Sequence, residues 1–213
     1  MGVFVAFEGI DGCGKGTQIH LTEKWLFNKD KKNTVLVTRN PYSYPQYEAE
    51  YERIRAFLKK MKDSREHAQT LAELFVSNRI YHSTNAVVPA LQNGWHVLTD
   101  RYDLSTLAYQ GGLQGIPILD LIKMHHGVRM PDLTVLFDVP AEVGLERRAS
   151  DQGLVTREVF DKMKIPEMDR LRQAYLTLPS QLLGRRIVVI DGTPAPEIVF
   201  ESVKKEIEKL FSL

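Results

Sequence analysis

The sequence predicts a doubly wound α/β domain, in which helices cover both faces of a parallel sheet. Short, apolar segments rich in β-branched residues recur along the chain, at residues 1–7, 34–38, 95–99, 133–137 and 187–190. Longer stretches with helical spacing separate these segments. Strands that alternate with helices are typical of a parallel sheet with crossover connections.

The apolar segments are interpreted as strands buried on both faces, because none alternates strictly between apolar and polar residues. The segment at residues 1–7 has no basic leader and is far shorter than the roughly 18 apolar residues of a membrane span. We therefore expect a buried strand there rather than a signal peptide, no membrane association, and a cytoplasmic protein.

Helical spacing is clearest at residues 15–28, 66–91 and 196–211. The last of these stretches places its apolar residues on one broad face and its lysines and glutamates elsewhere, as in an amphipathic helix packed on a sheet. These helices alternate with the predicted strands, which supports the α/β prediction.

Composition excludes several other classes of protein. The chain has 213 residues and a net charge of +1, with 28 basic and 27 acidic residues, so we expect no nucleic-acid partner. Cys13 is the only cysteine, which excludes an internal disulfide and fits a reducing compartment. His125 and His126 are adjacent on an expected helix and point in different directions, which favours structural roles over metal ligation.

A phosphate-binding loop follows the first predicted strand and precedes a predicted helix. Its pattern is G-x-x-x-x-G-K, in which glycines let the backbone approach a phosphate and a lysine adds positive charge. Backbone N–H groups of such a loop point at the bound anion. The residues expected to bind ATP here are Gly9, Ile10, Asp11, Gly12, Cys13, Gly14, Lys15, Gly16 and Thr17.

The loop departs from the common pattern after Lys15, where Gly16 stands in place of a hydroxyl residue. The hydroxyl comes one position later, at Thr17, so a direct and a water-mediated contact with Mg²⁺ both stay open. Cys13 lies near a helix N-terminus, which can lower a thiol pKa, but we interpret it as a small residue that fills the loop.

A second motif begins at the end of the strand predicted at residues 95–99. Ligands of open α/β sheets collect at the carboxyl ends of strands, and Asp100 and Arg101 lie at such an end. The carboxylate suits Mg²⁺ and the guanidinium suits a phosphate. On these two residues alone, an ion pair between them is an equally good interpretation.

The string at residues 100–110, Asp-Arg-Tyr-x-x-Ser-x-x-Ala-Tyr-Gln, closely resembles a signature of the thymidylate kinases. The stretches at residues 7–15, 38–41, 74–79 and 131–147 also resemble that family. The resemblance implies a P-loop NTPase fold with a five-stranded parallel sheet in the order 2-3-1-4-5. It further implies one domain over residues 1–213 with a small lid at about 147–160, ATP and dTMP as substrates, Mg²⁺ as cofactor, and a homodimer.

The resemblance also implies roles around the phosphate and sugar of dTMP. Arg39 and Arg101 would hold the acceptor phosphate. Tyr109 would crowd the position of a ribose 2′-hydroxyl and so favour deoxyribose. Asp11 would reach the sugar hydroxyl or the bound metal.

The base would be recognised by residues of two further segments. By resemblance, Phe75 would stack on the base, Arg79 would hydrogen-bond it, and Ser105 and Thr106 would lie beside it. Residues 75 and 79 are four apart on a predicted helix and so share a face, which suits joint recognition of one ring. The alternatives are a core position for Phe75 and a surface salt bridge for Arg79.

The expected reaction transfers the γ-phosphoryl group of ATP to dTMP, giving dTDP and ADP for dTTP synthesis. The acceptor is an anionic phosphate oxygen, so placement and neutralisation of charge are required rather than a general base. We expect Mg²⁺ at Thr17 and Asp100, catalysis by Lys15 with Arg101, and Arg147 near the adenine. The loop has no arginine before its lysine, so Arg148 and Arg157 of the lid are the candidates for charge on the transferring group.

Two departures from the family keep other functions open. Asn40 replaces a common acidic residue, and residues 42–51 are unusually rich in tyrosine. The main alternative is a nucleoside monophosphate kinase with another base preference, such as another deoxynucleotide or an adenylate-type substrate. Three other functions are less favoured. A deoxynucleoside kinase would need a general base, and a nucleotide-dependent switch would need a water-positioning residue. The third is an inactive homologue.

Overall fold

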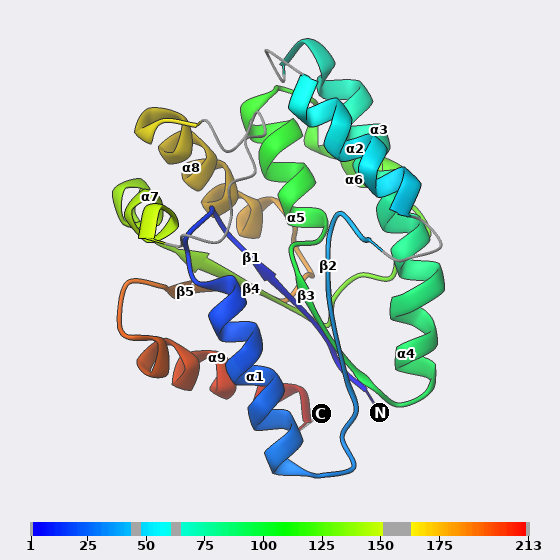
Figure 1. The fold of residues 1–213 in the computed structure, drawn as a ribbon, viewed down its shortest axis with the longest axis vertical. Coiled ribbons are helices and arrows are strands. Elements are labelled where there is room, and N and C mark those ends of the chain that lie inside the picture. The colour runs from blue at the N-terminus through cyan, green and yellow to red at the C-terminus, as the bar shows by residue number, and fades with distance from the viewer. Residues whose placement is uncertain (1, 44–47, 61–64, 151–162, 212–213) are drawn as a thin grey trace.

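The computed structural model describes residues 2–43, 48–60, 65–150 and 163–211. Its centre is a sheet of five parallel strands in the order β2-β3-β1-β4-β5 (Figure 1). This confirms the α/β class and the predicted strand order. The strands are β1 Phe4–Glu8, β2 Val35–Arg39, β3 His96–Asp100, β4 Leu133–Asp138 and β5 Ile187–Asp191.

Burial of the strands differs between the centre and the edges of the sheet. Strands β1, β3 and β4 are almost wholly buried, as predicted. The edge strands β2 and β5 are not: Val37 is 42 % exposed and Val189 is 45 % exposed. The prediction of two buried faces is therefore wrong for these two strands, because each lies at an edge of the sheet and has a neighbouring strand on one side only.

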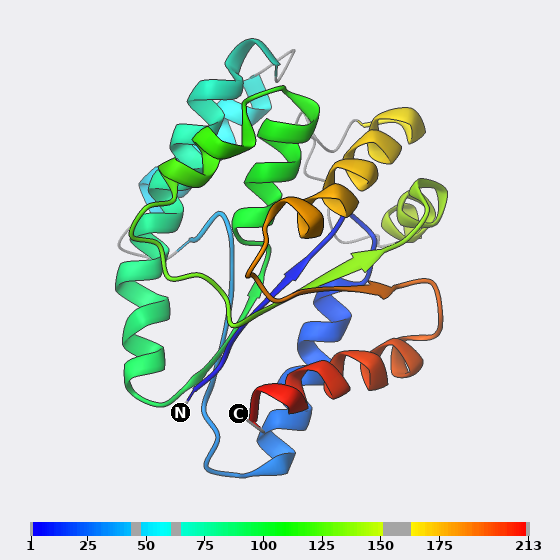
Figure 2. The same cartoon turned by 180° about the vertical axis from the view of Figure 1, so that it is seen from behind.

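Helices lie on both faces of the sheet (Figures 1 and 2). Helices α1 and α9 pack against each other on one face, and α3, α4, α5 and α8 lie over the other. The α-helices are α1 Lys15–Lys29, α2 Glu48–Lys60, α3 Ala68–His82, α4 Val88–Gln92, α5 Asp103–Thr106, α6 Ile118–Met124, α7 Ala141–Ser150, α8 Ile165–Gln181 and α9 Pro196–Phe211. Shorter turns are the 3₁₀ segment η2 Arg65–His67 and the π-helical segments η3 Ser83–Val87 and η4 Leu107–Leu113.

The predicted helices at residues 15–28 and 196–211 correspond to α1 and α9. The stretch at 66–91 is a continuous helical path made of α3, η3 and α4. The expected helix around His125 and His126 is wrong, because α6 ends at Met124 and both histidines lie in the turn that follows. Gly127, with a φ of 82°, continues this turn in a conformation that a helix cannot accommodate.

Large apolar side chains pack on the sheet beneath the loops at its carboxyl edge. Phe7 of β1 and Phe137 of β4 stack with ring centroids 6.1 Å apart, and both are buried. Each such side chain contributes on the order of 2 kcal/mol of burial free energy. Among the described residues, no helix is both long and apolar enough to cross a membrane.

Candidate active site

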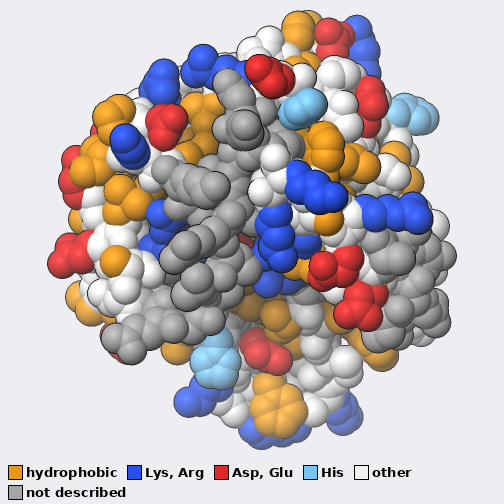
Figure 3. Space-filling view, turned by 45° about the horizontal axis from the view of Figure 1, so that its top comes forward, with side chains coloured by type: hydrophobic (Ala, Val, Ile, Leu, Met, Phe, Trp, Pro, Cys, Tyr) orange, Lys and Arg blue, Asp and Glu red, His pale blue; other side chains and the backbone are white. Residues whose placement is uncertain are grey.

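A cavity of about 1040 Å³ opens at the carboxyl ends of β1, β2 and β3. This is the edge at which open α/β sheets bind their ligands. Basic side chains gather around the middle of this face (Figure 3). The loop after β1, the ends of β2 and β3, helices α3 and α7, segment η4 and the loop after β5 all contribute to the lining.

The glycine-rich loop between β1 and α1 forms one wall, and its glycines are required by its geometry. Gly12 has a φ of 77°, and a Cβ atom there would lie 2.0 Å from the carbonyl oxygen of Gly144 on α7. Gly14, with a φ of 98°, is the N-cap of α1. A side chain at either position would force the loop out of this shape, because L-residues rarely adopt such φ values.

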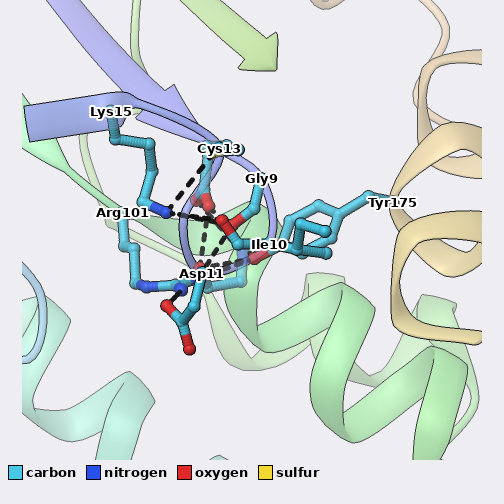
Figure 4. A network of polar contacts seen from close by, with 9 residues as sticks. Gly9, Ile10, Asp11, Cys13, Lys15, Arg101 and Tyr175 are labelled. Carbon is cyan, nitrogen blue, oxygen red and sulfur yellow. Dashed lines mark hydrogen bonds and ion pairs between the residues drawn. The ribbon is translucent and has the colours of Figure 1, made fainter. Parts of the chain in front are cut away.

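Lys15 is buried beneath this loop. Its Nζ donates to the carbonyl oxygens of Gly9 at 3.2 Å and Ile10 at 3.0 Å, and it lies 3.6 Å from the Sγ of Cys13 (Figure 4). Burial raises the pKa of the Cys13 thiol, although the nearby Lys15 charge opposes this. A neutral, buried thiol agrees with the interpretation of Cys13 as a residue that fills space in the loop.

Arg101 makes several hydrogen bonds within the cavity and has a φ of 65°, which is rare for a residue other than glycine. Its Nη2 donates to the Oδ1 of Asp11 at 2.5 Å, and its Nη1 donates to Tyr175 at 3.0 Å (Figure 4). Burial alone would raise the pKa of Asp11, but the charges of Arg101 and Lys15 lower it. Asp11 is therefore an ionised partner for Arg101.

Two residues that sequence reasoning missed hold this arginine and its neighbours in place. Glu8 is fully buried: its Oε1 accepts from the backbone N–H groups of Tyr102 at 2.7 Å and Ser105 at 3.1 Å. Its Oε2 accepts from the Ser105 hydroxyl at 2.7 Å, and burial raises its pKa. Tyr175 of α8 bonds both Ser105 and Arg101. A glutamate within an apolar strand was a usable clue, whereas nothing in the sequence around residue 175 points to the site.

Phe75 and Arg79 both project from α3 and line the cavity, as the four-residue spacing predicts. Phe75 packs on a small apolar cluster that includes Leu71. Arg79 is 2 % exposed, and it donates through Nε to the Oδ1 of Asn40 at 2.8 Å and through Nη1 to the Oγ1 of Thr106 at 3.0 Å. The alternative of a surface salt bridge is therefore wrong for Arg79, because the side chain is buried and its acceptors are neutral.

Other cavity residues come from several elements. Tyr109 lies in η4 with its ring perpendicular to that of Tyr175, at 6.4 Å between centroids. Arg39 ends β2 and lines the same cavity. Arg55 of α2 and Gln110 of η4 also line it, and sequence reasoning did not assign them. No pattern had predicted a helix around Arg55.

The predicted metal ligands both line the cavity. The Oδ1 of Asp100 is buried and has no hydrogen-bond partner in the part of the chain that the structure describes, and Thr17 follows the phosphate loop. Within the described ranges, no group of three or more histidine, cysteine or acidic residues could hold a metal by itself. Mg²⁺ is usually bound by one or two carboxylates together with substrate phosphates and water, so an uncommitted carboxylate beside a phosphate loop fits it. The alternative ion pair of Asp100 with Arg101 is wrong, because Arg101 pairs with Asp11.

The side of the cavity next to α7 carries further arginines. Arg147 donates to the carbonyl oxygens of Gly192 at 2.8 Å and Thr193 at 3.0 Å, in the loop after β5. Arg148 lines the cavity, and its charge helps to lower the pKa of Asp11. Arg157 and residues 151–160 of the predicted lid lie outside the described residues.

A fold that ends its first strand in a phosphate loop, and brings arginines to one cavity from two neighbouring strands, defines a P-loop nucleotide kinase. The sequence matches the family model described as thymidylate kinase over residues 7–203. The chain therefore belongs to the thymidylate kinase family, and it is a phosphotransferase.

Several relatives support this assignment over nearly their whole length. A protein named thymidylate kinase from Nitrosomonas eutropha is 36 % identical over 99 % of this chain and 94 % of its own. Proteins of the same name from Citrifermentans bemidjiense and Thermomicrobium roseum are 38 % and 37 % identical. These alignments cover 91 % and 95 % of this chain, and 85 % and 93 % of the relatives. The family resemblance inferred from the motifs is thus confirmed.

Proposed function

We propose that this thymidylate kinase transfers the γ-phosphoryl group of ATP to dTMP, giving dTDP and ADP, with Mg²⁺ as cofactor. The observation that carries the proposal is that two kinds of anion-binding group line one cavity. One is the phosphate loop with Lys15, and the other is the pair Arg39 and Arg101. Two anionic substrates that must meet in line require such an arrangement.

On the donor side, the backbone N–H groups from Gly12 to Thr17 would bind the β- and γ-phosphates. Lys15 would exchange its bonds to loop carbonyls for bonds to phosphate oxygens, which are stronger because both partners are charged. Residues Gly9 to Gly16 would cradle the rest of the triphosphate. Arg147, held against the loop after β5, would lie near the adenine.

On the acceptor side, Arg39 and Arg101 would hold the phosphate of dTMP. Arg101 is paired with Asp11 in this structure. An incoming dianion would replace that carboxylate as a partner, which frees Asp11 to bond the sugar hydroxyl. Tyr109 would exclude a ribose 2′-hydroxyl.

The transfer itself would form a bond between an acceptor phosphate oxygen and the γ-phosphorus as the bond to the β–γ bridging oxygen breaks. The electron pair of the broken bond stays on ADP. No proton has to be removed from the acceptor, so Lys15, Arg101, Arg148 and Arg157 would act by neutralising charge. Arg148 and Arg157 belong to a proposed lid at about residues 147–160 of a single domain, which would also exclude water.

Thr17 and Asp100 would hold Mg²⁺ together with the phosphates. When bound, the ion neutralises charge on the β- and γ-phosphate oxygens. The unpartnered Oδ1 of Asp100 supports this role, since a buried carboxylate oxygen requires some partner.

Base recognition would fall to Phe75 by stacking and to Arg79 by hydrogen bonding, with Ser105 and Thr106 beside the ring. The i, i+4 placement of the first two side chains on α3 supports their joint action on one ring. Thr106 already accepts a hydrogen bond from Arg79, so these two polar groups would act together on the base.

We also propose a homodimer in the cytoplasm. Exposed apolar side chains on α3 and α6, which contact each other, are suited to an interface: Ile80, Leu119 and Ile122. Light scattering at micromolar concentration tests the dimer, and a monomer would contradict it. The single cysteine supports a reducing compartment.

A coupled assay of ADP release tests the function across dTMP, dUMP, dCMP, dGMP and AMP. We expect dTMP to be the best acceptor, and a clear preference for another base would contradict the proposal. Lys15→Ala should lower turnover by about 10²-fold or more, the scale of one lost transition-state partner. An exposed lysine on the opposite side of the fold, Lys209→Ala, is the control.

A further inference from the structure

Arg79 is a buried cation that is held by neutral groups. In the described part of the chain, the acceptors of its guanidinium are the Oδ1 of Asn40, the Oγ1 of Thr106 and the Nε2 of His125, at 2.8, 3.0 and 2.6 Å. We call Asn40, Thr106 and His125 the acceptor frame. Asp103 acts on Arg79 through its charge, but it is bonded to Arg185.

The contacts of His125 fix which of its ring nitrogens carries the proton. Its Nδ1 lies 2.7 Å from the carbonyl oxygen of Leu121, which can only accept, so Nδ1 must be protonated. Its Nε2 lies 2.6 Å from the Nη1 of Arg79, which can only donate, so Nε2 must be bare. His125 is therefore neutral and protonated at Nδ1.

His82 contacts Asn40 of the acceptor frame, and its proton lies on Nε2 rather than on Nδ1. Because Arg79 donates to the Oδ1 of Asn40, the amide nitrogen of Asn40 faces His82 and donates to its Nδ1 at 2.7 Å. The Nε2 of His82 then carries the proton and donates to the hydroxyl of Thr38 at 2.9 Å. The ring of Tyr42 stacks on His82 with centroids 4.3 Å apart and closes this side.

We propose that His125 and His82 are positioning residues that lock Arg79 as a hydrogen-bond donor toward the base of the acceptor nucleotide. This inference rests on the proposed function and names a basis for its specificity. Every fixed partner of Arg79 accepts, and its hydrogen bonds to the described residues use Nε and Nη1, which leaves Nη2 for a ligand in the cavity. A pyrimidine with a carbonyl at position 4 accepts from this group, whereas cytosine presents an amino group that cannot.

The charges around both rings agree with neutral histidines. Burial, followed by the charge of Arg79, lowers the pKa of His125 to about 4, although Asp103 opposes this and Arg185 adds to it. Burial and Arg79 lower the pKa of His82 to about 3. Protonation of either ring would turn an acceptor into a second donor and break the frame.

The first test is independent of catalysis. Two-bond ¹H–¹⁵N correlation spectra at pH 7 should show His125 as the neutral Nδ1–H tautomer and His82 as the neutral Nε2–H tautomer. His125→Gln and His82→Gln assign the two ring systems by the loss of signals among the six histidines. A charged ring at either position, or an Nε2–H tautomer at His125, would overturn the inference.

The second test separates the effect of the acceptor atom Nε2 of His125 from the effect of the planar shape of its ring. His125→Phe keeps the planar ring but loses Nε2, whereas His125→Gln keeps an oxygen that accepts from Arg79 and an N–H that reaches Leu121. In His125→Phe the ratio of kcat/KM for dTMP to that for dCMP should fall by about tenfold, the scale of one hydrogen bond to a charged group. The fall in kcat/KM for dTMP should come from a higher KM for dTMP, with kcat nearly unchanged.

His125→Gln should restore most of the lost selectivity, and the neighbouring exposed residue provides the control His126→Phe. Equal selectivity in the Phe and Gln variants, or wild-type selectivity in His125→Phe, would overturn the positioning role. A wild-type enzyme that fails to phosphorylate dTMP would overturn the proposed function and this specificity with it. The spectra would still decide the two tautomers separately, because the tautomers are read from the wild-type protein and the variants serve only to assign its signals.

Discussion

Acidification from pH 7 to pH 5 is expected to lower the free energy of unfolding by about 2 kcal/mol through His125 alone. The pKa of this buried ring is about 4 in the folded chain against 6.5 for the free side chain, because of burial and then the charge of Arg79. The unfolded chain therefore binds the proton more readily. This contribution to stability is fully present above pH 6.5 and is lost as the pH falls toward about 4.

The magnitude follows from the proton uptake. Between pH 7 and pH 5 the unfolded chain takes up about 0.7 of a proton at residue 125, whereas the folded chain takes up about 0.1, and the difference integrates to about 2 kcal/mol. His82, with a pKa of about 3, adds a similar amount, so the two rings together account for about 4 kcal/mol. Glu8 acts in the opposite direction, because its raised pKa favours the protonated folded state as the pH falls.

Urea unfolding followed by the fluorescence of Trp25 and Trp95 at several pH values measures this loss. The comparison is between the wild type and His125→Gln, which removes one titrating ring and leaves Glu8 in place. The drop between pH 7 and pH 5 should shrink by about 2 kcal/mol in the variant. His126→Gln, at an exposed position, should keep the wild-type drop. Equal drops in the wild type and His125→Gln would refute the reasoning.

Three further predictions concern the same cavity. Gly12→Ala should lower the free energy of unfolding by roughly 1–3 kcal/mol and weaken ATP binding, because its Cβ would meet the carbonyl of Gly144; wild-type urea unfolding would contradict this. Asn40→Asp should raise the pKa of His82 from about 3, since a carboxylate favours a proton on Nδ1, and an NMR titration with no shift would exclude it. Tyr109→Ala should raise kcat/KM for ribonucleotides relative to deoxyribonucleotides by roughly tenfold, the scale of steric rejection of a small group; an unchanged ratio removes Tyr109 as the sugar gate.

Those parts of the site that depend on short-range patterns could be predicted from the sequence. The phosphate loop around Lys15 is one continuous motif between a strand and a helix. Residue 39 ends β2 and residue 101 follows β3, and these two strands are neighbours in the sheet, so both arginines reach one cavity. Residues 75 and 79 share a face because of helical periodicity alone.

The contacts that orient these groups could not be predicted, because they join residues that are distant in the sequence. Glu8 meets Tyr175 on α8 only once the helix has packed on the sheet. His125 meets Arg79 from the turn that follows α6, a helix boundary that the sequence pattern missed. Sequence reasoning assigned His125 a structural role and had no means of finding its partner.

Arg101 and Arg79 of the cavity differ in a way that matches the ligands proposed for them. Arg101 is paired with the carboxylate of Asp11, an anion that a substrate phosphate can replace without leaving a buried charge unpaired. Arg79 is held instead by neutral acceptors, which satisfy its N–H groups without an anion in contact. A base carbonyl is also neutral, so its arrival requires no ion pair to be broken. It gains a bond from a charged donor that contacts no carboxylate among the described residues, although the charge of Asp103, which is paired with Arg185, also acts on it. The partners in the folded chain therefore favour replacement of Asp11 by a phosphate at Arg101. At Arg79 they favour retention of the neutral acceptors when the base binds, as the proposed sites require.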